Sequence, residues 1–527
     1  MFLDWLLSFS PILAILILML GFRWRGLQAG SVGWLIALLV SALRFGAGWE
    51  LLAYAQLKGL LLTLFVVYII WGALLFFRVT EEAGAVKAVG AWLPRLTPDR
   101  GLQALLLGWV FSTFLQGVGG FGVPVAVVAP LLIGLGFPPV AAIVIPSVGH
   151  PWAVTFGSLG SSFYALMAAT GREGEELAPW CAAMLGLACL ACGAGTLWAA
   201  GGRRTLRSGL IPMLVIGLAM AGTQFLVVSL GLWSIGAMTA GLVGLAVGVA
   251  WARWQARSKK QEARDKRREA RGRRQEAGNR EQETGMPFKW ALTPYGLLVA
   301  IVLIALIPPV RALLGQVVIQ AQFPELATAR GWVVEAGTGR TINLFGHAGA
   351  LLTYASLIAY GLYRWRGNLT PGAAGRILRG VTKRGARSAL GTLAMVGMAV
   401  TMENAGMTNL LAEGIARAVG RAFPLAAPFI GALGAFMTGS NTNSNVVFGD
   451  LQQSVAALIG VSPLVILAAQ TAGGAIGSAF APAKIIVGCS TVDAEEGPVL
   501  RKVMRYGLAI VALLALATGI AVYLAGL

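Results

Sequence analysis

The chain carries long apolar runs that are almost free of charge, and these constrain its fold more than any other feature. Each run is long enough, or nearly so, to cross roughly 30 Å of hydrocarbon as a helix. Backbone groups in lipid must pair within their own segment, which favours helices, and the runs lack the alternation of outer-membrane barrel strands. An all-α polytopic membrane protein is predicted. The runs are residues 5–21, 28–44, 57–77, 178–200, 208–228, 229–252, 291–313 and 503–525.

Charge is scarce and lies in the loops. Only 12% of the residues are charged, although the net charge is +19; soluble proteins carry about 25%. The basic residues gather in loops that one consistent topology places in the cytoplasm, and this distribution predicts that both termini lie outside. A membrane topology accounts for the basic charge, so no nucleic-acid partner is expected. The four cysteines lie in apolar segments and are interpreted as packing residues, with no metal site and no cofactor.

A basic stretch at residues 253–290 divides the chain. It has almost no apolar residues and cannot bury a core, so a solvated cytoplasmic linker is predicted, able to touch anionic lipid headgroups. The flanking parts, 1–252 and 291–527, are predicted to be the two halves of the protein.

These halves repeat the same order of features. An apolar arm leads to a polar or glycine-rich tip, a second apolar arm follows, and then comes a long helix interrupted near its middle. The charge distribution gives the two hairpins opposite orientations. Inverted repeats with broken helices are typical of transporters. We predict about 12 transmembrane helices plus two re-entrant hairpins, at 101–137 and 424–460, with broken helices at 138–170 and 463–490 interrupted near Ser147–His150 and Thr471–Gly474.

The two tips are the predicted substrate site. Non-helical backbone at membrane depth is tolerated where it lines a cavity. Helical segments expected to begin near Pro124, Pro151, Val446 and Ala475 would point their positive N-termini at one region, which suits a carboxylate. The alternative is that the polar tip residues only cap two helix ends. The predicted substrate-binding residues are Gln116, Gly119, Gly120, Phe121, Gly122, Ser147, His150, Thr438, Ser440, Asn441, Thr442, Asn443, Ser444, Asn445, Gln470 and Thr471.

These motifs resemble those of the bacterial L-lactate/glycolate permease family, part of a superfamily of ion transporters with paired re-entrant hairpins. The resemblance implies secondary active transport of lactate-like anions, usually proton-coupled, with an elevator-like motion of the hairpins in a bacterial cytoplasmic (inner) membrane. It runs along most of the chain and is strongest at GVGGFGVPVA (117–126), GLGFPP (134–139), TFGSLG (155–160), FMTGSNTNSNVVF (436–448) and IGVSPLVILAAQTAGG (459–474).

The chain departs from the family pattern at several of these positions. Gln116 and Asn441 stand where family members commonly have Glu and Asp, and Ser478 stands where a Lys is common. Gln470 replaces an Asn, and the stretch from His150 to Gly157 replaces N-T-A-P-V-A-F-G. Two acids and one base are thus replaced by neutral groups.

Few ionisable groups remain for ion coupling, and such groups inside a membrane are functional candidates. Glu403, His150 and Lys484 are the coupling candidates. Their alternatives are an interfacial or salt-bridged Glu403, a packed neutral His150 and a Lys484 that extends to the interface. Asp450 is interpreted as a helix polar contact.

A secondary transporter of a small 2-hydroxy-monocarboxylate such as L-lactate or glycolate, coupled to protons, is the predicted function. The alternatives are a carrier of another organic anion, a sulfonate or dicarboxylate, with sodium coupling, and a channel. An enzyme is not expected, because no nucleophile with a base and no cluster of metal ligands is recognisable. The expected partners are the small carboxylate anion, a proton or sodium ion and the lipid bilayer, and an oligomer is allowed.

Overall fold

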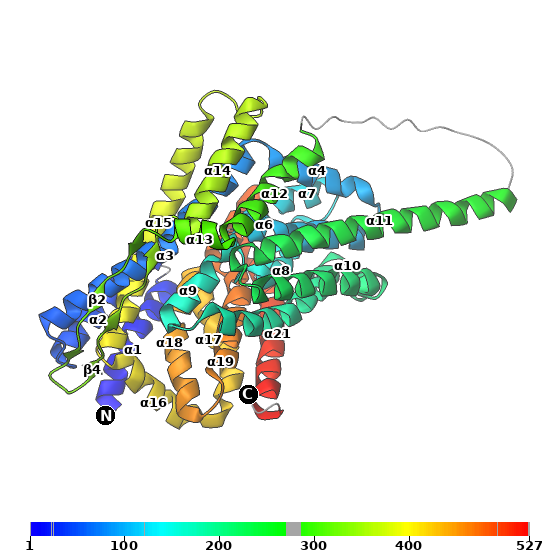
Figure 1. Cartoon of the computed structure of the whole chain (residues 1–527). Helices are drawn as coiled ribbons and strands as arrows, with labels where there is room; N and C mark the ends of the chain where they lie inside the picture. Colours follow the sequence, from blue (N-terminus) through cyan, green and yellow to red (C-terminus); the bar gives the residue numbers. More distant parts are fainter. Residues whose placement is uncertain are drawn as a thin grey trace.

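The computed structural model describes residues 2–22, 24, 26–120, 122–269, 286–492 and 494–524, and nearly all of its elements are helices. In this part of the chain nine helices are long and apolar enough to cross a membrane, or ten if the bent pair Lys289–Ala305 and Pro308–Leu314 forms one span. The predicted all-α polytopic fold is confirmed (Figure 1). The number of about twelve crossings stays a prediction.

The first half begins with helices joined by short turns. These are α1 (Phe2–Leu16, continued by a π-helix to Gly21), α2 (Gly26–Leu43), α3 (Trp49–Glu82) and the short α4 (Ala85–Trp92). The first hairpin follows, with one arm made of α5 (Arg100–Gln103), a π-helical segment (Ala104–Phe111) and α6 (Ser112–Val118), and with α7 (Val123–Gly134) as its second arm. The first broken helix consists of α8 (Pro139–Gly149), two 3-10 turns (Pro151–Ala153 and Ser158–Gly160) and α9 (Ser161–Thr170).

The remaining helices of the first half are α10 (Gly174–Ser229) and α11 (Gly236–Glu269). Non-helical backbone at Gly201 and Gly202 divides α10 into two helices. Because α11 runs on to Glu269, the first part of the predicted linker is helical, while residues 270–285 lie outside the described residues. The division of the chain at this linker stays a prediction.

The second half repeats the element order around a second hairpin. It contains α12 (Phe288–Ala305), α13 (Pro308–Leu314), α14 (Ala348–Trp365), α15 (Ala373–Asn404) and the short α16 (Met407–Val419). The second hairpin is α17 (Phe423–Thr438) and α18 (Asn441–Ile459). The second broken helix is α19 (Pro463–Gly477), a 3-10 turn (Ser478–Phe480) and α20 (Pro482–Val492), and α21 (Glu496–Leu524) ends the chain's described part.

Residues 318–343 form a long two-stranded arm that the sequence analysis did not predict. We call it the strand arm. Its strands are β1 (Val318–Ile319), β2 (Gln322–Phe323), β3 (Leu326–Ala327), β4 (Val333–Val334), β5 (Gly337–Thr338) and β6 (Ile342–Asn343). They form three antiparallel pairs along the arm: β1 pairs with β6, β2 with β5 and β3 with β4.

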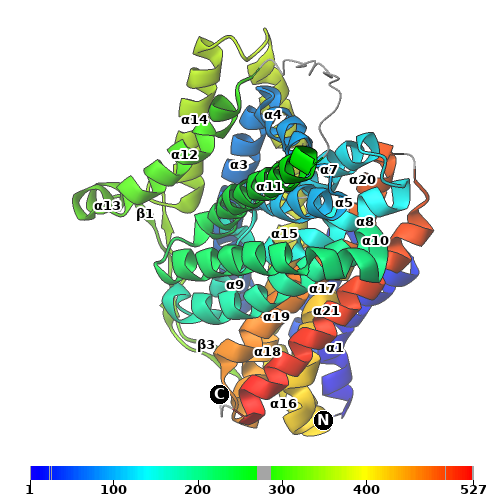
Figure 2. The same cartoon turned by 90° about the vertical axis from the view of Figure 1, so that its right-hand side faces the viewer.

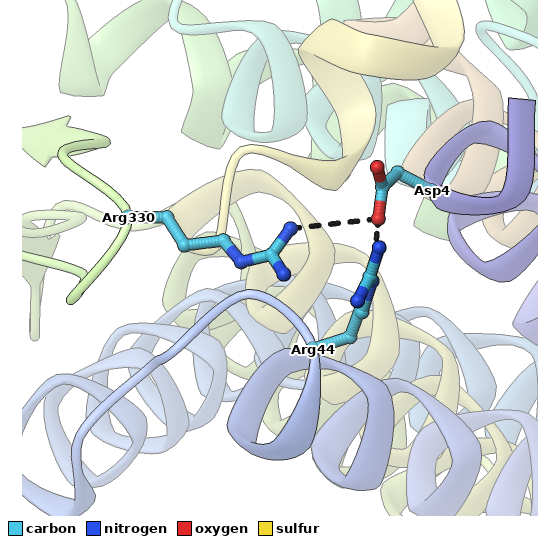
Figure 3. Close-up of polar contacts among 3 residues, drawn as sticks. All are labelled: Asp4, Arg44 and Arg330. Carbon is cyan, nitrogen blue, oxygen red and sulfur yellow. Dashed lines mark hydrogen bonds and ion pairs between the residues drawn. The ribbon is translucent and has the colours of Figure 1, made fainter. Parts of the chain in front are cut away.

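Polar contacts fix the tip of the strand arm to the first helices. Asp4 on α1 accepts hydrogen bonds from Arg44 Nε (2.5 Å) and from Arg330 Nη1 of the arm (3.4 Å), as Figure 3 shows. The Ala329 amide donates to the Gly46 carbonyl oxygen at 2.9 Å. The arm therefore crosses one end of the helix bundle, from α13 and α14 to α1 and α2 (Figure 1).

Each hairpin packs against the broken helix of the other half. The second arm of the first hairpin, α7, lies along α20, and the second arm of the second hairpin, α18, lies along α9 (Figure 2). Gly449 of α18 faces Leu166 and Thr170 of α9. Each hairpin also packs on the broken helix of its own half, α7 on α8 and α17 and α18 on α19, so each hairpin contacts both broken helices.

The interruptions of both broken helices differ from the prediction. The first break is longer than expected, because the chain does not return to α-helix until Ser161 rather than near Pro151. The second was placed wrongly at Thr471–Gly474: α19 continues to Gly477, and the break falls at residues 478–481.

Close packing explains why the glycines of α19 do not break it. A Cβ atom at Gly473 would overlap the Pro428 carbonyl oxygen of α17, and one at Gly477 would overlap the carbonyl oxygen of Ala432. Small residues let membrane helices approach closely without ending them.

Gly473→Ala is therefore expected to destabilise the protein by about 1–3 kcal/mol through overpacking. The four cysteines are buried, so a thiol-reactive dye reports their exposure on heating. We expect a lower unfolding midpoint for purified Gly473→Ala. The control is Gly497→Ala, since a Cβ there meets no atom within 4 Å; equal midpoints for the two variants would contradict this account of the α17–α19 contact.

Candidate functional site

A buried group of hydroxyl and amide side chains joins the second hairpin to both broken helices. We call it the polar cluster; its members are Thr155, Ser162, Asn441, Thr442, Asn445 and Thr471. All six are buried. Thr155 comes from the break of the first broken helix, Ser162 from the first turn of α9, the next three from the start of α18, and Thr471 from the middle of α19.

Hydrogen bonds connect the members across these elements. Asn445 Nδ2 donates to Thr471 Oγ1 (2.9 Å) and to the Ser162 carbonyl oxygen (3.0 Å). Asn441 Nδ2 lies 3.2 Å from both Thr155 Oγ1 and Thr471 Oγ1, and these two hydroxyls are 3.1 Å apart. A hydrogen bond of 3.0 Å links the hydroxyls of Ser162 and Thr442. The sequence prediction therefore found four of the six members and missed Thr155 and Ser162.

Two amide oxygens of the polar cluster have unused bonding capacity. Asn441 Oδ1 and Asn445 Oδ1 are buried and have no hydrogen-bond partner among the residues that the structure describes. The assignment of oxygen and nitrogen in such amides follows from their hydrogen bonds, and here the amide nitrogens donate to the hydroxyls and the carbonyl. An unsatisfied buried acceptor costs about 1–3 kcal/mol. A ligand that donates a hydrogen bond, or a cation, would recover this cost.

Gln470 and Ser444 hold the arms of the second hairpin on α19. Gln470 Nε2 donates to Ser444 Oγ at 3.1 Å, and Ser444 Oγ donates to the Gly431 carbonyl oxygen at 2.8 Å. Gln452 Nε2 lies 2.5 Å from Gln470 Oε1. These bonds lie within the second hairpin and α19. The predicted residues Gln470 and Ser444 therefore adjoin the polar cluster without belonging to it.

Other tip residues cap helices, as the alternative interpretation expected. Ser440 is the N-cap of α18, and its hydroxyl accepts from the Asn443 amide at 3.3 Å. Thr438 Oγ1 donates to the Gly434 carbonyl oxygen at 2.8 Å. Asn443 Oδ1 accepts from Thr392 of α15 at 3.3 Å. The polar tip is thus shorter than predicted, because α18 begins at Asn441 rather than near Val446.

The tip of the first hairpin packs on the same break. A Cβ atom at Gly120 would overlap Ser158 Oγ, and one at Gly157 would lie 2.9 Å from Gln116 Nε2. Gly120 and Gly122 have φ of 58° and 83°, which only glycine adopts readily. The ring of Phe77 covers Gly119, and Phe121 lies outside the described residues. Both tips therefore contact the stretch 155–162.

Ser147, His150 and Lys484 lie elsewhere along the broken helices. Ser147 Oγ donates to the Ile143 carbonyl oxygen at 2.8 Å, and His150 Nδ1 lies 2.6 Å from the Pro146 carbonyl oxygen. His150 Nε2 is buried without a partner. Lys484 Nζ donates to Ser478 Oγ at 3.0 Å, so an ammonium group reaches the position where the family resemblance implies a lysine. Among the described residues no hydrogen bond connects these three to the polar cluster.

A cavity of about 420 Å³ opens beside the polar cluster, under the strand arm. Four ionisable side chains face it: Lys58 of α3, Arg340 of the strand arm, Glu403 of α15 and Asp450 of α18. Glu403 is exposed to the cavity although protein surrounds it. Val446, the residue after Asn445, also lines the cavity, whereas the six members of the polar cluster do not.

The sequence analysis missed the two cations of this cavity and assigned Asp450 to a helix contact. Lys58 is a lone charge at the start of an apolar run, and that signal could have identified it. Arg340 lies in a loop with no recognisable motif. Burial lowers the pKa of the Arg340 side chain, while nearby Glu173 and Tyr164 raise it. A guanidinium stays charged in proteins.

Comparison with known proteins shows the family of this chain. The model of the L-lactate permease family matches residues 4–525, and so includes both hairpins and both broken helices. The chain belongs to the L-lactate permease family. The L-lactate permease of Bacillus subtilis (strain 168) is 27% identical over 558 residues, covering 98% of each chain. That of Escherichia coli (strain K12) is 26% identical over 535 residues, covering 98% of this chain and 96% of the relative.

Two solved transporter structures are similar at a lower level. The YdaH transporter of Alcanivorax borkumensis has a TM-score of 0.44 at 14% identity, with coverage of 86% of this chain and 84% of the other. MtrF of Neisseria gonorrhoeae has a TM-score of 0.43 at 15% identity, with coverage of 86% and 80%. The resemblance to the family that the motifs indicated is thus confirmed by the family match, at the identity of a divergent member.

Removing the Asn445 amide is expected to loosen the polar cluster. Asn445→Ala deletes two hydrogen bonds between α18 and the two broken helices, at a cost of about 1–3 kcal/mol. The dye-based unfolding midpoint should fall relative to the parent protein. Asn409→Ala, which deletes one bond to Glu413 within α16, serves as control; a midpoint for Asn445→Ala no lower than the control's would contradict the role of these bonds.

Proposed function

We propose that this lactate permease relative is a proton-coupled secondary transporter of small 2-hydroxy-monocarboxylates such as L-lactate or glycolate, and that the polar cluster binds the substrate. Family membership supports lactate transport. One observation of the structure carries the assignment of the site: two buried amide oxygens without partners lie where a hairpin tip meets both broken helices.

The chemistry of the polar cluster suits a 2-hydroxy acid. The first turn of α18 presents backbone N–H groups and the positive end of a helix dipole, which favour a carboxylate. The substrate's hydroxyl would donate to Asn441 Oδ1 or Asn445 Oδ1 and accept from a threonine hydroxyl. Together these groups would neutralise the anion without a buried cation in the cluster itself.

Glu403 is the proposed proton carrier. Its carboxylate faces the cavity beside the polar cluster, where water can deliver a proton. Protonating it would remove one negative charge from the path of the anion, so proton and anion would move together.

We further propose that the hairpins and broken helices move as one unit in an elevator-like step. The protein would lie in the inner membrane, with both termini outside.

Uptake by the reconstituted protein tests the site. Thr471→Val keeps the side-chain volume but removes the hydroxyl that joins Thr155, Asn441 and Asn445. Losing bonds of this kind is expected to lower L-lactate uptake about tenfold or more. Thr518→Val is the matched control, since that buried hydroxyl bonds only within α21. Normal uptake by Thr471→Val would exclude the polar cluster as the substrate site.

Glu403→Gln tests the coupling. The variant cannot carry a proton, so accumulation driven by a pH gradient should fall to the level without a gradient, while lactate–lactate exchange across proteoliposomes continues. Glu413→Gln on α16 is the control, because Glu413 faces Asn409 and Arg417 rather than the cavity. Undiminished pH-driven accumulation would reject Glu403 as carrier. Accumulation that follows an imposed sodium gradient instead would favour the sodium-coupled alternative.

A further inference from the structure

We propose that the 420 Å³ cavity under the strand arm is a second, outer carboxylate-binding site, in which Arg340 and Lys58 hold the incoming monocarboxylate before it reaches the polar cluster. The inference rests on the proposed function and adds a site and two ligands to it. A three-carbon hydroxy acid fills only part of a cavity of this volume, so the anion would bind together with water.

Arg340 lines the cavity without an ion pair among the described residues, although Glu173 is close enough to act on its charge. Its guanidinium stacks over the Phe65 ring, with the central carbon 4.3 Å from the ring centroid. Its Nε is buried and has no hydrogen-bond partner in the described part of the chain. Within the described residues no carboxylate lies within ion-pair distance of it. A planar guanidinium held by an aromatic ring in the wall of a cavity suits binding of a carboxylate through its terminal N–H groups.

Lys58 of α3 supplies a second cation to the same cavity. Its ammonium donates to Asn404 Oδ1 at 3.2 Å and lies 5.2 Å from the centroid of the Phe323 ring. Phe323 and Arg340 both belong to the strand arm, so the arm positions both cations. Lys58 also has no ion-pair partner in the described part of the chain, and two of its three N–H donors remain available for a ligand.

The two acids complete the charge balance of the cavity. Glu403 and Asp450 face it from α15 and α18, yet among the described residues neither forms an ion pair with Arg340 or Lys58. Lys58 and Glu403 act on each other's charge without forming an ion pair, so both cations remain able to bind an incoming anion. Asp450 lies one helical turn beyond Val446 on α18, the helix that carries three members of the polar cluster.

The concentration dependence of L-lactate uptake tests the cations. In right-side-out vesicles, Arg340→Gln and Lys58→Met should each raise KM about tenfold, the effect of losing a charge-assisted hydrogen bond, with the maximal rate nearly unchanged. Arg311→Gln removes an exposed cation from α13, away from the cavity, and should leave KM unchanged. Gel filtration and the unfolding midpoint confirm that the variants are folded.

Two outcomes separate this inference from the proposed function. A parent protein that accumulates no lactate rejects the proposed function itself. A parent protein that accumulates lactate while Arg340→Gln and Lys58→Met keep the parental KM rejects only the outer site.

Ligand protection of an introduced cysteine tests the site independently of transport rates. Thr338 is exposed and lines the cavity, and the natural cysteines are buried. A membrane-impermeant thiol reagent should modify Thr338→Cys, and L-lactate should slow this modification. Ala336→Cys lies on the same arm outside the cavity and should be modified equally with and without L-lactate. Equal rates with and without L-lactate for Thr338→Cys would overturn the outer site.

Discussion

The hydrogen bonds between the second hairpin and both broken helices are the constraint on which the rest of this structure depends. Polar side chains surrounded by apolar protein and lipid are costly unless they bond one another. Asn441, Asn445 and Thr471 satisfy most of that requirement by joining three chain segments at one place. They leave two amide oxygens without a partner among the described residues, and in the proposed function these oxygens accept a hydrogen bond from the substrate.

The packing around the polar cluster explains how such a site is kept at membrane depth. Each hairpin lies along the broken helix of the other half, α7 on α20 and α18 on α9. Glycines bring the backbones into direct contact, so that α17 and α19 approach at Gly431 and Gly473. This arrangement surrounds the interrupted backbone with protein, which is the condition for irregular structure inside a membrane. The cavity under the strand arm lies farther along α18, where Val446 and Asp450 line it.

Much of this arrangement could be predicted from the sequence, because it depends on local pattern. Apolar runs identified the helices, and the glycines around Gly120 and the amides around Asn443 identified the hairpin tips. Other features depend on tertiary packing. The glycines near Gly473 have the composition of a helix break, but in the structure they are a close contact between helices. The strand arm has strands of two residues, too short to show periodicity. Arg340 reaches the cavity only because this arm folds across the bundle.

The central claim is that the substrate binds between the tip of the second hairpin and the two broken helices. Cryo-electron microscopy of the purified protein with saturating L-lactate tests it most directly. The account predicts ligand density within hydrogen-bonding distance of Asn441, Asn445 and Thr471. Density confined to another part of the molecule, such as the region of His150 and Lys484, with the polar cluster unchanged and empty, would contradict it.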